Sequence, residues 1–282
     1  MKLYQQKHRF LSMLLVFVML MTFVPMDALA NTGTTLKGAI ETVEVDSNAI
    51  TGRENNFNKG WKFFLGSNSS ASNKNFDDSS WDNVDLPHDF SITQSFTSSG
   101  EAESGFLPGG TGWYRKSFTL PASSAGKTFL LNFDGVYSDA YIYVNGTAVG
   151  EHHYGYTSFA FDITEHLVAD GVTENVIAVK AVNNIPSSRW YSGSGIYRDV
   201  TLFAVNDVHV DLNGTKITTP NIASGNGTVD VEVKVVNNGI SSTEVTVKNT
   251  VYKKGSDAAL ATASKNVTVA AGTTGEVTSS TL

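Results

Sequence analysis

The sequence predicts an all-β protein made of two successive β domains. Between residues 55 and 205, short apolar runs alternate with turn residues, and no segment has convincing helical periodicity. Beyond Val205, aromatic residues nearly vanish, and valine and threonine dominate regularly spaced runs. Many short strands separated by turn signals are typical of sandwich, jelly-roll or barrel folds.

The first 30 residues have the pattern of a secretory signal peptide. A positively charged start precedes an apolar run of 15 residues at 10–24, and Ala28-Leu29-Ala30 supplies the small residues of a cleavage site. The run is short for a membrane span, so an uncleaved anchor is the weaker alternative. We expect a secreted bacterial protein, or one displayed at the cell surface through a region beyond residue 282, with no membrane attachment after cleavage at Ala30. Residues 31–54 are predicted to be a spacer or an early edge strand.

The first domain is predicted over residues 55–205. Alternation in residues 57–65 places Trp61, Phe63 and Leu65 on one face of a strand. Asn145-Gly146 is the preferred two-residue turn of a hairpin at 140–150, and residues 164–167 are expected to form one helical turn. Further strands are predicted at 128–133, 159–164, 175–182 and 199–205.

The second domain is predicted over residues 206–282 as an immunoglobulin-like sandwich. Strands are expected at 208–212, 227–236, 243–252 and 265–270, with turns such as Asn237-Asn238-Gly239 between them. An immunoglobulin-like sandwich has about seven strands and about a hundred residues. We therefore expect the chain to end inside this domain.

Composition narrows the classes of function. The chain has 20 Lys and Arg against 27 Asp and Glu, a formal net charge of −7, which argues against a nucleic-acid partner. Aromatic residues make up 11% of the chain, and many adjoin Gly, Ser, Asn or Asp, which favours neutral polar ligands. Cysteine is absent, so the core must stabilise the fold without disulfides.

One stretch, residues 187–200, combines features of a sugar-binding loop. Trp190 and Tyr191 offer flat amphipathic surfaces, Arg189 is a fork of donors, and Gly193 and Gly195 permit close backbone approaches. A loop that leads into a strand can reach out from a rigid scaffold to a ligand. The alternative is a corner, anchored by the tryptophan, that closes a sandwich.

No other pattern is typical of a catalytic or metal centre. The neighbouring acids at 77–78 and at 101 and 103 lie in serine-rich loops and are expected to be solvated. His152 and His153 point to opposite faces of a strand and are expected to be surface residues. His88 and Asp89 follow Pro87 and can bond hydroxyls, or else form a structural turn.

Several segments together resemble the N-terminal half of glycoside hydrolase family 2, most closely its bacterial β-galactosidases. They are residues 57–65 (FNKGWKFFL), 76–90 (FDDSSWDNVDLPHDF), 109–118 (GGTGWYRKSF), 133–150 (FDGVYSDAYIYVNGTAVG) and 189–200 (RWYSGSGIYRDV). The resemblance implies a galactose-binding-like jelly roll, an immunoglobulin-like domain and then a TIM barrel that carries two catalytic glutamates. The barrel is expected beyond Leu282, so no catalytic residue is assigned and this chain alone is expected to be inactive. Family members often use Mg or Na in the catalytic domain, which assigns no metal ligand here.

The resemblance also implies a sugar site. In the family, the loop before the last of these segments faces the barrel mouth, which makes Asn183, Asn184 and Arg189 candidate hydroxyl partners and Trp190 a candidate wall, with Tyr191 beside it. No carboxylate lies between Asn184 and Asp199, which argues against a sodium site. Arg198 and Asp199 are expected to pair.

Three classes of function remain open from the sequence. The first is a secreted retaining β-galactosidase that acts on β-galactoside sugars, or its relatives β-glucuronidase and β-mannosidase, with this chain supporting its own barrel. The second is a stand-alone secreted carbohydrate-binding module. The third is a purely structural pair of sandwiches that spaces a catalytic domain.

Overall fold

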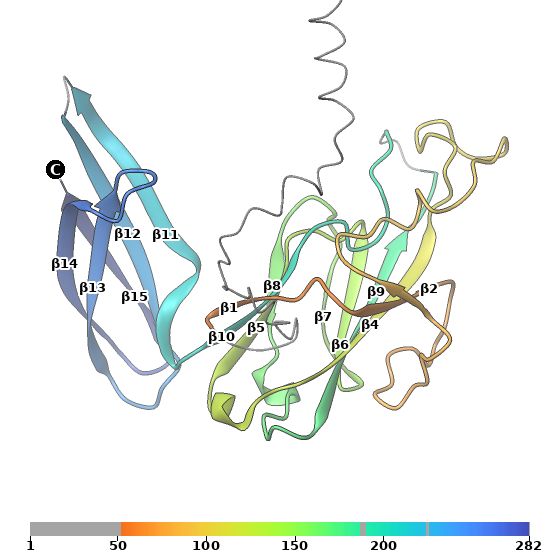
Figure 1. Ribbon diagram of the computed structural model, residues 1–282, viewed down its shortest axis with the longest axis horizontal. Coiled ribbons are helices and arrows are strands. Elements are labelled where there is room, and N and C mark those ends of the chain that lie inside the picture. The colour runs from red at the N-terminus through yellow and green to blue at the C-terminus, as the bar shows by residue number, and fades with distance from the viewer. Residues whose placement is uncertain (1–51, 187–189, 224–225, 282) are drawn as a thin grey trace, which may run out of the picture. The chain divides into compact units, whose positions relative to one another are not determined.

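The computed structural model describes residues 52–186, 190–223 and 226–281 (Figure 1). The predicted all-β class is confirmed, because these residues form fifteen strands and two 3-10 helices of three residues each. The predicted signal peptide, most of the predicted spacer and Arg189 lie outside the described residues. Within the described ranges, no helix has the length and apolar character needed to cross a membrane.

The first ten strands form two antiparallel sheets that face each other across one core. One sheet has the order β1-β10-β5-β8 and the other has the order β3-β2-β4-β9-β6-β7. The elements are β1 (Glu54–Asn56), β2 (Trp61–Leu65), β3 (Asp82–Val84), β4 (Gly110–Thr119), η2 (Ala122–Ser124), β5 (Thr128–Phe133), β6 (Asp139–Val144), β7 (Thr147–His152), β8 (Phe159–Asp162), η3 (Thr164–His166), β9 (Glu174–Asn183) and β10 (Val200–Val205).

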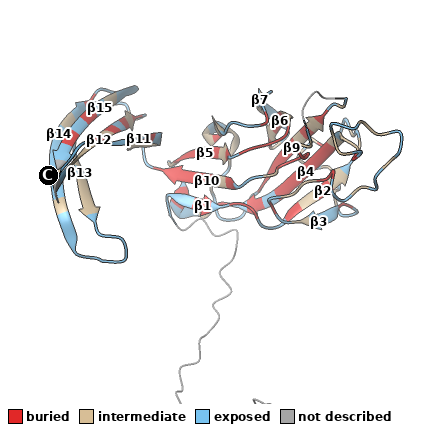
Figure 2. Ribbon diagram, turned by 90° about the horizontal axis from the view of Figure 1, so that it is seen from above, coloured by how far each residue is buried: buried red, intermediate tan, exposed pale blue. Residues whose placement is uncertain are grey.

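Buried residues of both sheets, red in Figure 2, form the core of this first sandwich. Phe133 and Leu202 come from one sheet, and Trp61 and Tyr114 from the other, and all four are fully buried. Leu65 was expected on the same buried face as Trp61, but it lies at the end of β2 and is 42% exposed.

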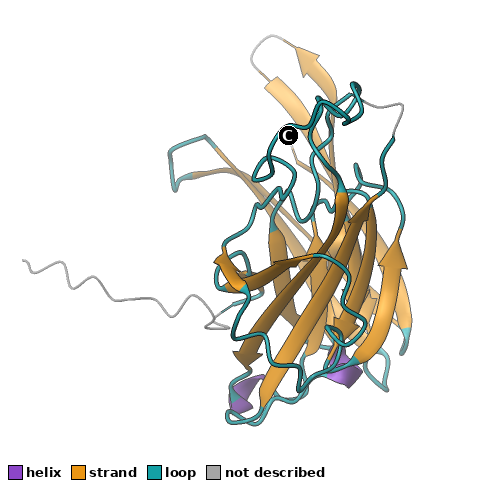
Figure 3. Ribbon diagram, turned by 90° about the vertical axis from the view of Figure 1, so that its right-hand side faces the viewer, coloured by secondary structure: helices purple, strands orange, loops and turns teal. Residues whose placement is uncertain are grey.

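The predicted hairpin and helical turn are both present. Asn145 and Gly146 join β6 to β7 with φ values of +49° and +89°, as a two-residue type I′ turn requires. Helix η3 supplies the predicted turn at Thr164–His166. In Figure 3 the two short helices lie at one end of the strands, and long loops occupy the other end.

A buried arginine fixes the long loop between β2 and β3 to the outer face of the six-stranded sheet. Arg115 is 1% exposed. Its guanidinium donates to the main-chain oxygens of Ala71, Asn73 and Lys74 at 2.6, 3.0 and 3.2 Å, and to the carboxylate of Asp78 at 2.7 Å. Asp78 was expected to be a solvated loop charge, and it is instead the ion-pair partner of this arginine.

The remaining five described strands form a smaller sandwich with a valine core. A three-stranded sheet, β11-β12-β15, packs on the two-stranded sheet β13-β14. The strands are β11 (Val208–Ala223), β12 (Asn226–Asn237), β13 (Thr243–Tyr252), β14 (Ala259–Val269) and β15 (Thr273–Thr281). Strand β15 was not located from the sequence, because this segment is mostly Thr and Ser and carries one valine, Val277, on the buried face.

Candidate functional site

The loops at the end of β9 meet the loop that follows β3, and the carboxylate of Asp89 joins them. Its Oδ1 accepts the main-chain N–H of Ser91 and of Ser194, both at 2.9 Å. Its Oδ2 accepts the hydroxyl of Tyr191. Three donors from the protein therefore use this carboxylate, and two of them belong to the predicted sugar loop.

Backbone pairing and two glycines bring these segments together. The N–H groups of His88 and Phe90 donate to the carbonyls of Ile196 and Ser194, at 2.8 and 2.9 Å. Gly193 and Gly195 have φ values of +77° and +106°, a region that disfavours other residues. A Cβ on Gly193 would lie 2.9 Å from Asp89 Oδ2, so the close approach also needs glycine.

Asn183 lies beneath the loop rather than at its surface. It is 7% exposed, and its Nδ2 donates to the Gly193 carbonyl at 3.2 Å and to Ser194 Oγ at 2.8 Å. Ser91 Oγ lies 2.6 Å from Ser194 Oγ, and its hydroxyl donates to the Pro108 carbonyl at 2.8 Å. The cavity beside these groups measures about 10 Å³, which is room for about one water molecule.

His88 belongs to the same hydrogen-bonded cluster. Its Nδ1 lies 2.9 Å from the hydroxyl of Tyr114, and its ring packs on Phe63 with centroids 4.6 Å apart. Burial lowers the pKa of His88 below 6.5 and raises the pKa of Tyr114. Burial and the bond to Asp89 also raise the pKa of the Tyr191 hydroxyl. At neutral pH the cluster therefore holds an uncharged imidazole and two protonated tyrosines.

The predicted site residues divide into two groups. His88, Asp89, Asn183 and Tyr191 are occupied by bonds within the protein, and Arg189 lies outside the described residues. Asn184 and Trp190 are exposed, and Trp190 is 73% exposed. Sugar binding by any of them stays a prediction, and the structure leaves Asn184 and Trp190 as the open positions.

Sequence reasoning missed the partners that hold the loop, and it paired one residue wrongly. Ser91 and Ser194 gave no motif, because their contact joins positions 103 residues apart. Asp199 does not pair with Arg198: it accepts the Asn58 amide at 2.8 Å, and the Arg198 guanidinium lies 5.3 Å from the centroid of the Tyr197 ring.

No metal centre is assembled in the part of the chain that the structure describes: three or more His, Asp or Glu side chains are nowhere grouped to hold an ion. The carboxylate of Asp89 contacts the predicted loop at Tyr191 and Ser194, and its oxygens are used by N–H and O–H donors.

Comparison with known proteins adds the family. Residues 67–206 match the model of the sugar-binding domain of glycosyl hydrolases family 2. A β-galactosidase of Bacteroides ovatus is 40% identical over 205 residues, which are 71% of this chain and 24% of that protein. A putative β-glucuronidase of Formosa agariphila is 40% identical over 185 residues, 64% of this chain and 18% of its own length.

Solved structures show the same likeness in three dimensions. A family 2 glycosyl hydrolase of Bacteroides cellulosilyticus superposes with a TM-score of 0.77 at 35% identity, covering 81% of this chain and 30% of that chain. A β-glucuronidase of Bacteroides uniformis superposes with a TM-score of 0.71 at 32% identity, covering 81% and 27%. The chain thus spans about a quarter of the length of these relatives.

Proposed function

Because the chain belongs to glycosyl hydrolase family 2, we propose that it is the non-catalytic N-terminal part of a secreted, retaining β-galactosidase. The two catalytic carboxylates of a retaining enzyme would come from the rest of the longer polypeptide. The observation that supports a role at the sugar is the exposed Trp190 on a loop fixed by the Asp89 cluster. A rigidly held aromatic ring can stack on the C–H face of a pyranose at little entropic cost.

The role of Trp190 is tested in the longer enzyme by Trp190→Ala. We expect KM for an aryl β-galactoside to rise about tenfold with a smaller change in kcat, because a stacking wall contributes about 1–2 kcal/mol of binding. The matched control is Tyr252→Ala, an exposed aromatic residue of the second sandwich. Equal KM values for the two variants would show that Trp190 is scaffold.

A second candidate activity, β-glucuronidase, has the same support from relatives, because named β-glucuronidases match this chain as well as β-galactosidases do. The longer protein should be assayed with an aryl β-galactoside and the matching β-glucuronide at equal concentration. If kcat/KM is higher for the β-galactoside than for the β-glucuronide, the protein is a β-galactosidase. The reverse order identifies a β-glucuronidase.

We propose further that residues 1–282 alone hydrolyse neither substrate. The purified chain should give no turnover above buffer, and measurable turnover would contradict the proposal. Cleavage after Ala30 is tested by the intact mass of the protein recovered from the culture medium. A mass that matches a chain starting at Asn31 supports secretion. An uncleaved chain that still starts at Met1 and stays with the cells supports an anchor.

A further inference from the structure

A series of hydrogen bonds runs beneath the end of the predicted sugar loop, from Ile196 through Tyr114 to His88. The phenol oxygen of Tyr114 accepts the main-chain N–H of Ile196. The same oxygen lies 2.9 Å from Nδ1 of His88. Tyr114 and Ile196 are both 0% exposed, so bulk water does not reach these bonds. Since the N–H of Ile196 already occupies one side of the oxygen, the hydroxyl proton of Tyr114 is donated to His88.

This arrangement requires a neutral imidazole. Nδ1 of His88 accepts the phenol proton only when it carries no proton itself, which leaves the ring proton on Nε2. When His88 is protonated, its Nδ1 and the N–H of Ile196 are both donors toward one phenol oxygen, and the Tyr114 proton has no acceptor. A buried polar hydrogen without an acceptor is unfavourable, so protonation of the ring weakens the whole series of bonds.

The surroundings of His88 decide its charge. Burial of the ring, which packs on Phe63 of β2 and Tyr114 of β4, is the largest effect and lowers the pKa below 6.5. The carboxylates of Asp89, the next residue, and of Asp82 on β3 act in the opposite direction and raise this pKa. Within the described ranges, Tyr114, Asp89 and Asp82 are the titratable groups that act on the ring. The closed corner therefore binds a proton less readily than an opened one.

The segment that carries His88 holds the sugar loop at three positions. The N–H of His88 donates to the carbonyl of Ile196 at 2.8 Å. Asp89, the next residue, accepts the hydroxyl of Tyr191 and the N–H of Ser194. A movement of His88 therefore acts directly on the bonds that fix the loop.

We propose that His88 is an acid-sensitive anchor of the sugar loop: protonation of its ring releases the Tyr114 hydroxyl and loosens the loop that carries Trp190. The consequence for sugar binding rests on the proposed function, in which Trp190 contacts the substrate. The anchor is complete above pH 6.5. It weakens as the pH falls below 6.5 toward the pKa of His88 in the folded protein.

Hydrogen exchange of residues 1–282 tests the anchor without any sugar. The reporter is the amide of Ile196, whose exchange rate is corrected for the pH dependence of the chemical step and converted into an opening constant. We expect the opening constant to rise from about pH 7.5 to about pH 5, by at most about tenfold per pH unit, because one proton is taken up. An opening constant that does not change with pH would overturn the proposal.

Two variants separate His88 from the other acidic groups. The side-chain oxygen of asparagine lies near the position of Nδ1 and stays an acceptor at every pH, so His88→Asn should remove the acid sensitivity of Ile196. Tyr114→Phe removes a bond to the neutral ring and should therefore raise the pKa of His88 in an NMR titration. Acid sensitivity that persists in His88→Asn, or an unchanged pKa of His88 in Tyr114→Phe, would overturn the proposal.

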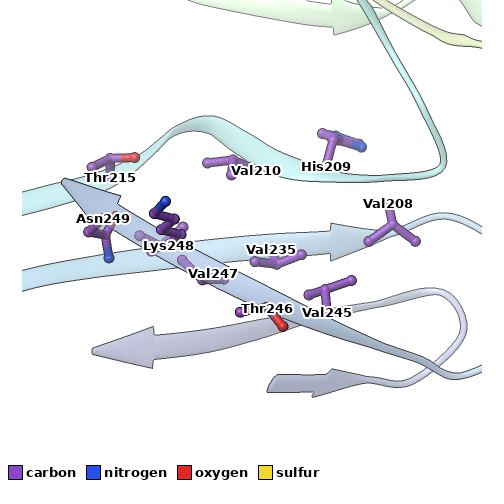
Figure 4. A pocket seen from close by; sticks show the side chains of 11 residues that line it. Val208, His209, Val210, Thr215, Val235, Val245, Thr246, Val247, Lys248 and Asn249 are labelled. Atoms are coloured by element: carbon purple, nitrogen blue, oxygen red, sulfur yellow. The ribbon is translucent and has the colours of Figure 1, made fainter. Parts of the chain in front are cut away.

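The matched control is His209→Asn in the second sandwich. His209 lies beside a valine-lined groove (Figure 4), and its Nδ1 lies 2.8 Å from the carbonyl oxygen of Asn206. A carbonyl only accepts, so this Nδ1 is a donor in both charge states and protonation breaks no bond. The control should keep the acid sensitivity of Ile196, and an equal loss in His209→Asn and His88→Asn would overturn the proposal.

The longer enzyme tests the consequence for the sugar. Below pH 6.5, KM for the glycoside that it cleaves should rise more steeply in the unaltered enzyme than in His88→Asn. The same rise in both would overturn the link to sugar binding. The two proposals fail separately: an Ile196 amide that ignores pH in an active enzyme overturns the anchor alone, whereas an acid-sensitive amide without galactoside or glucuronide turnover overturns the proposed function alone.

Discussion

Replacing Arg115 with alanine should unfold the first sandwich at a much lower urea concentration. The guanidinium is 1% exposed and makes four short bonds, to three carbonyls and to Asp78. At about 1 kcal/mol for each lost bond, Arg115→Ala costs about 4 kcal/mol, within the range for breaking a buried ion pair. Arg115→Lys keeps the charge but loses the planar fork of donors, and about 2 kcal/mol is expected.

Tryptophan fluorescence reports this unfolding selectively, because all four tryptophans, at positions 61, 81, 113 and 190, lie in the first sandwich. With a slope of about 2 kcal/mol per molar urea, the midpoint should fall by about 2 M in Arg115→Ala. The control is Lys59→Ala, which removes an exposed ion pair with Asp85 (2.7 Å) and should cost less than about 1 kcal/mol. If Arg115→Ala destabilises no more than the control, the loop does not depend on this arginine.

Two further predictions concern a glycine and a histidine. Gly195→Ala should lower the free energy of unfolding by about 3 kcal/mol or more in the same urea assay, because φ is +106° and the new Cβ would overlap the Tyr114 hydroxyl. The control is Gly126→Ala, where φ is +79° but the space is open, and the expected loss is about 1 kcal/mol. An equal cost for both would refute the steric argument. The pKa of His153 is raised above 6.5 by bonds to Asp139, at 3.0 Å, and to Glu151. Protonated His153 therefore makes its whole contribution to the stability of the fold below pH 6.5. That contribution is lost as the pH rises through the pKa of His153 in the folded protein. An NMR titration should find this pKa above 6.5 and lower in Asp139→Asn; an unchanged value would refute the role of Asp139.

The apolar pattern of the sequence predicts a strand well where apolar side chains are buried, and poorly where backbone pairing alone makes the strand. Strand β9 was predicted almost to its bounds because its apolar residues are continuous. Strand β15 has almost no apolar pattern, and it forms because β12 pairs with it along its length. The predicted burial of Leu65 at the end of β2 was wrong for the opposite reason. The apolar alternation continues to Leu65, but the core does not extend that far.

The candidate site was predictable as a place but not as a set of contacts. The glycines and aromatic residues at 190–195 predicted the position of the loop, because glycines permit close backbone approaches and aromatic residues offer flat surfaces for a ligand. The bonds that hold it join Asp89 to Ser194 across 105 residues of sequence. Nothing local in either segment specifies such a contact, so Asp89 could be identified only as a residue able to bond hydroxyls.

The two interpretations of the loop, sugar contact and structural corner, apply to different residues within it. Tyr191 and Ser194 belong to the corner, because the Tyr191 hydroxyl and the Ser194 N–H donate to Asp89. Trp190 has no such bond among the described residues and is 73% exposed. A side chain whose position is fixed before the ligand arrives contributes more to affinity, because less conformational entropy is lost on binding. We therefore expect the corner to support a sugar contact at Trp190: Asp89→Ala, which removes the bonds from Tyr191 and Ser194, should weaken sugar binding in the longer enzyme as Trp190→Ala does.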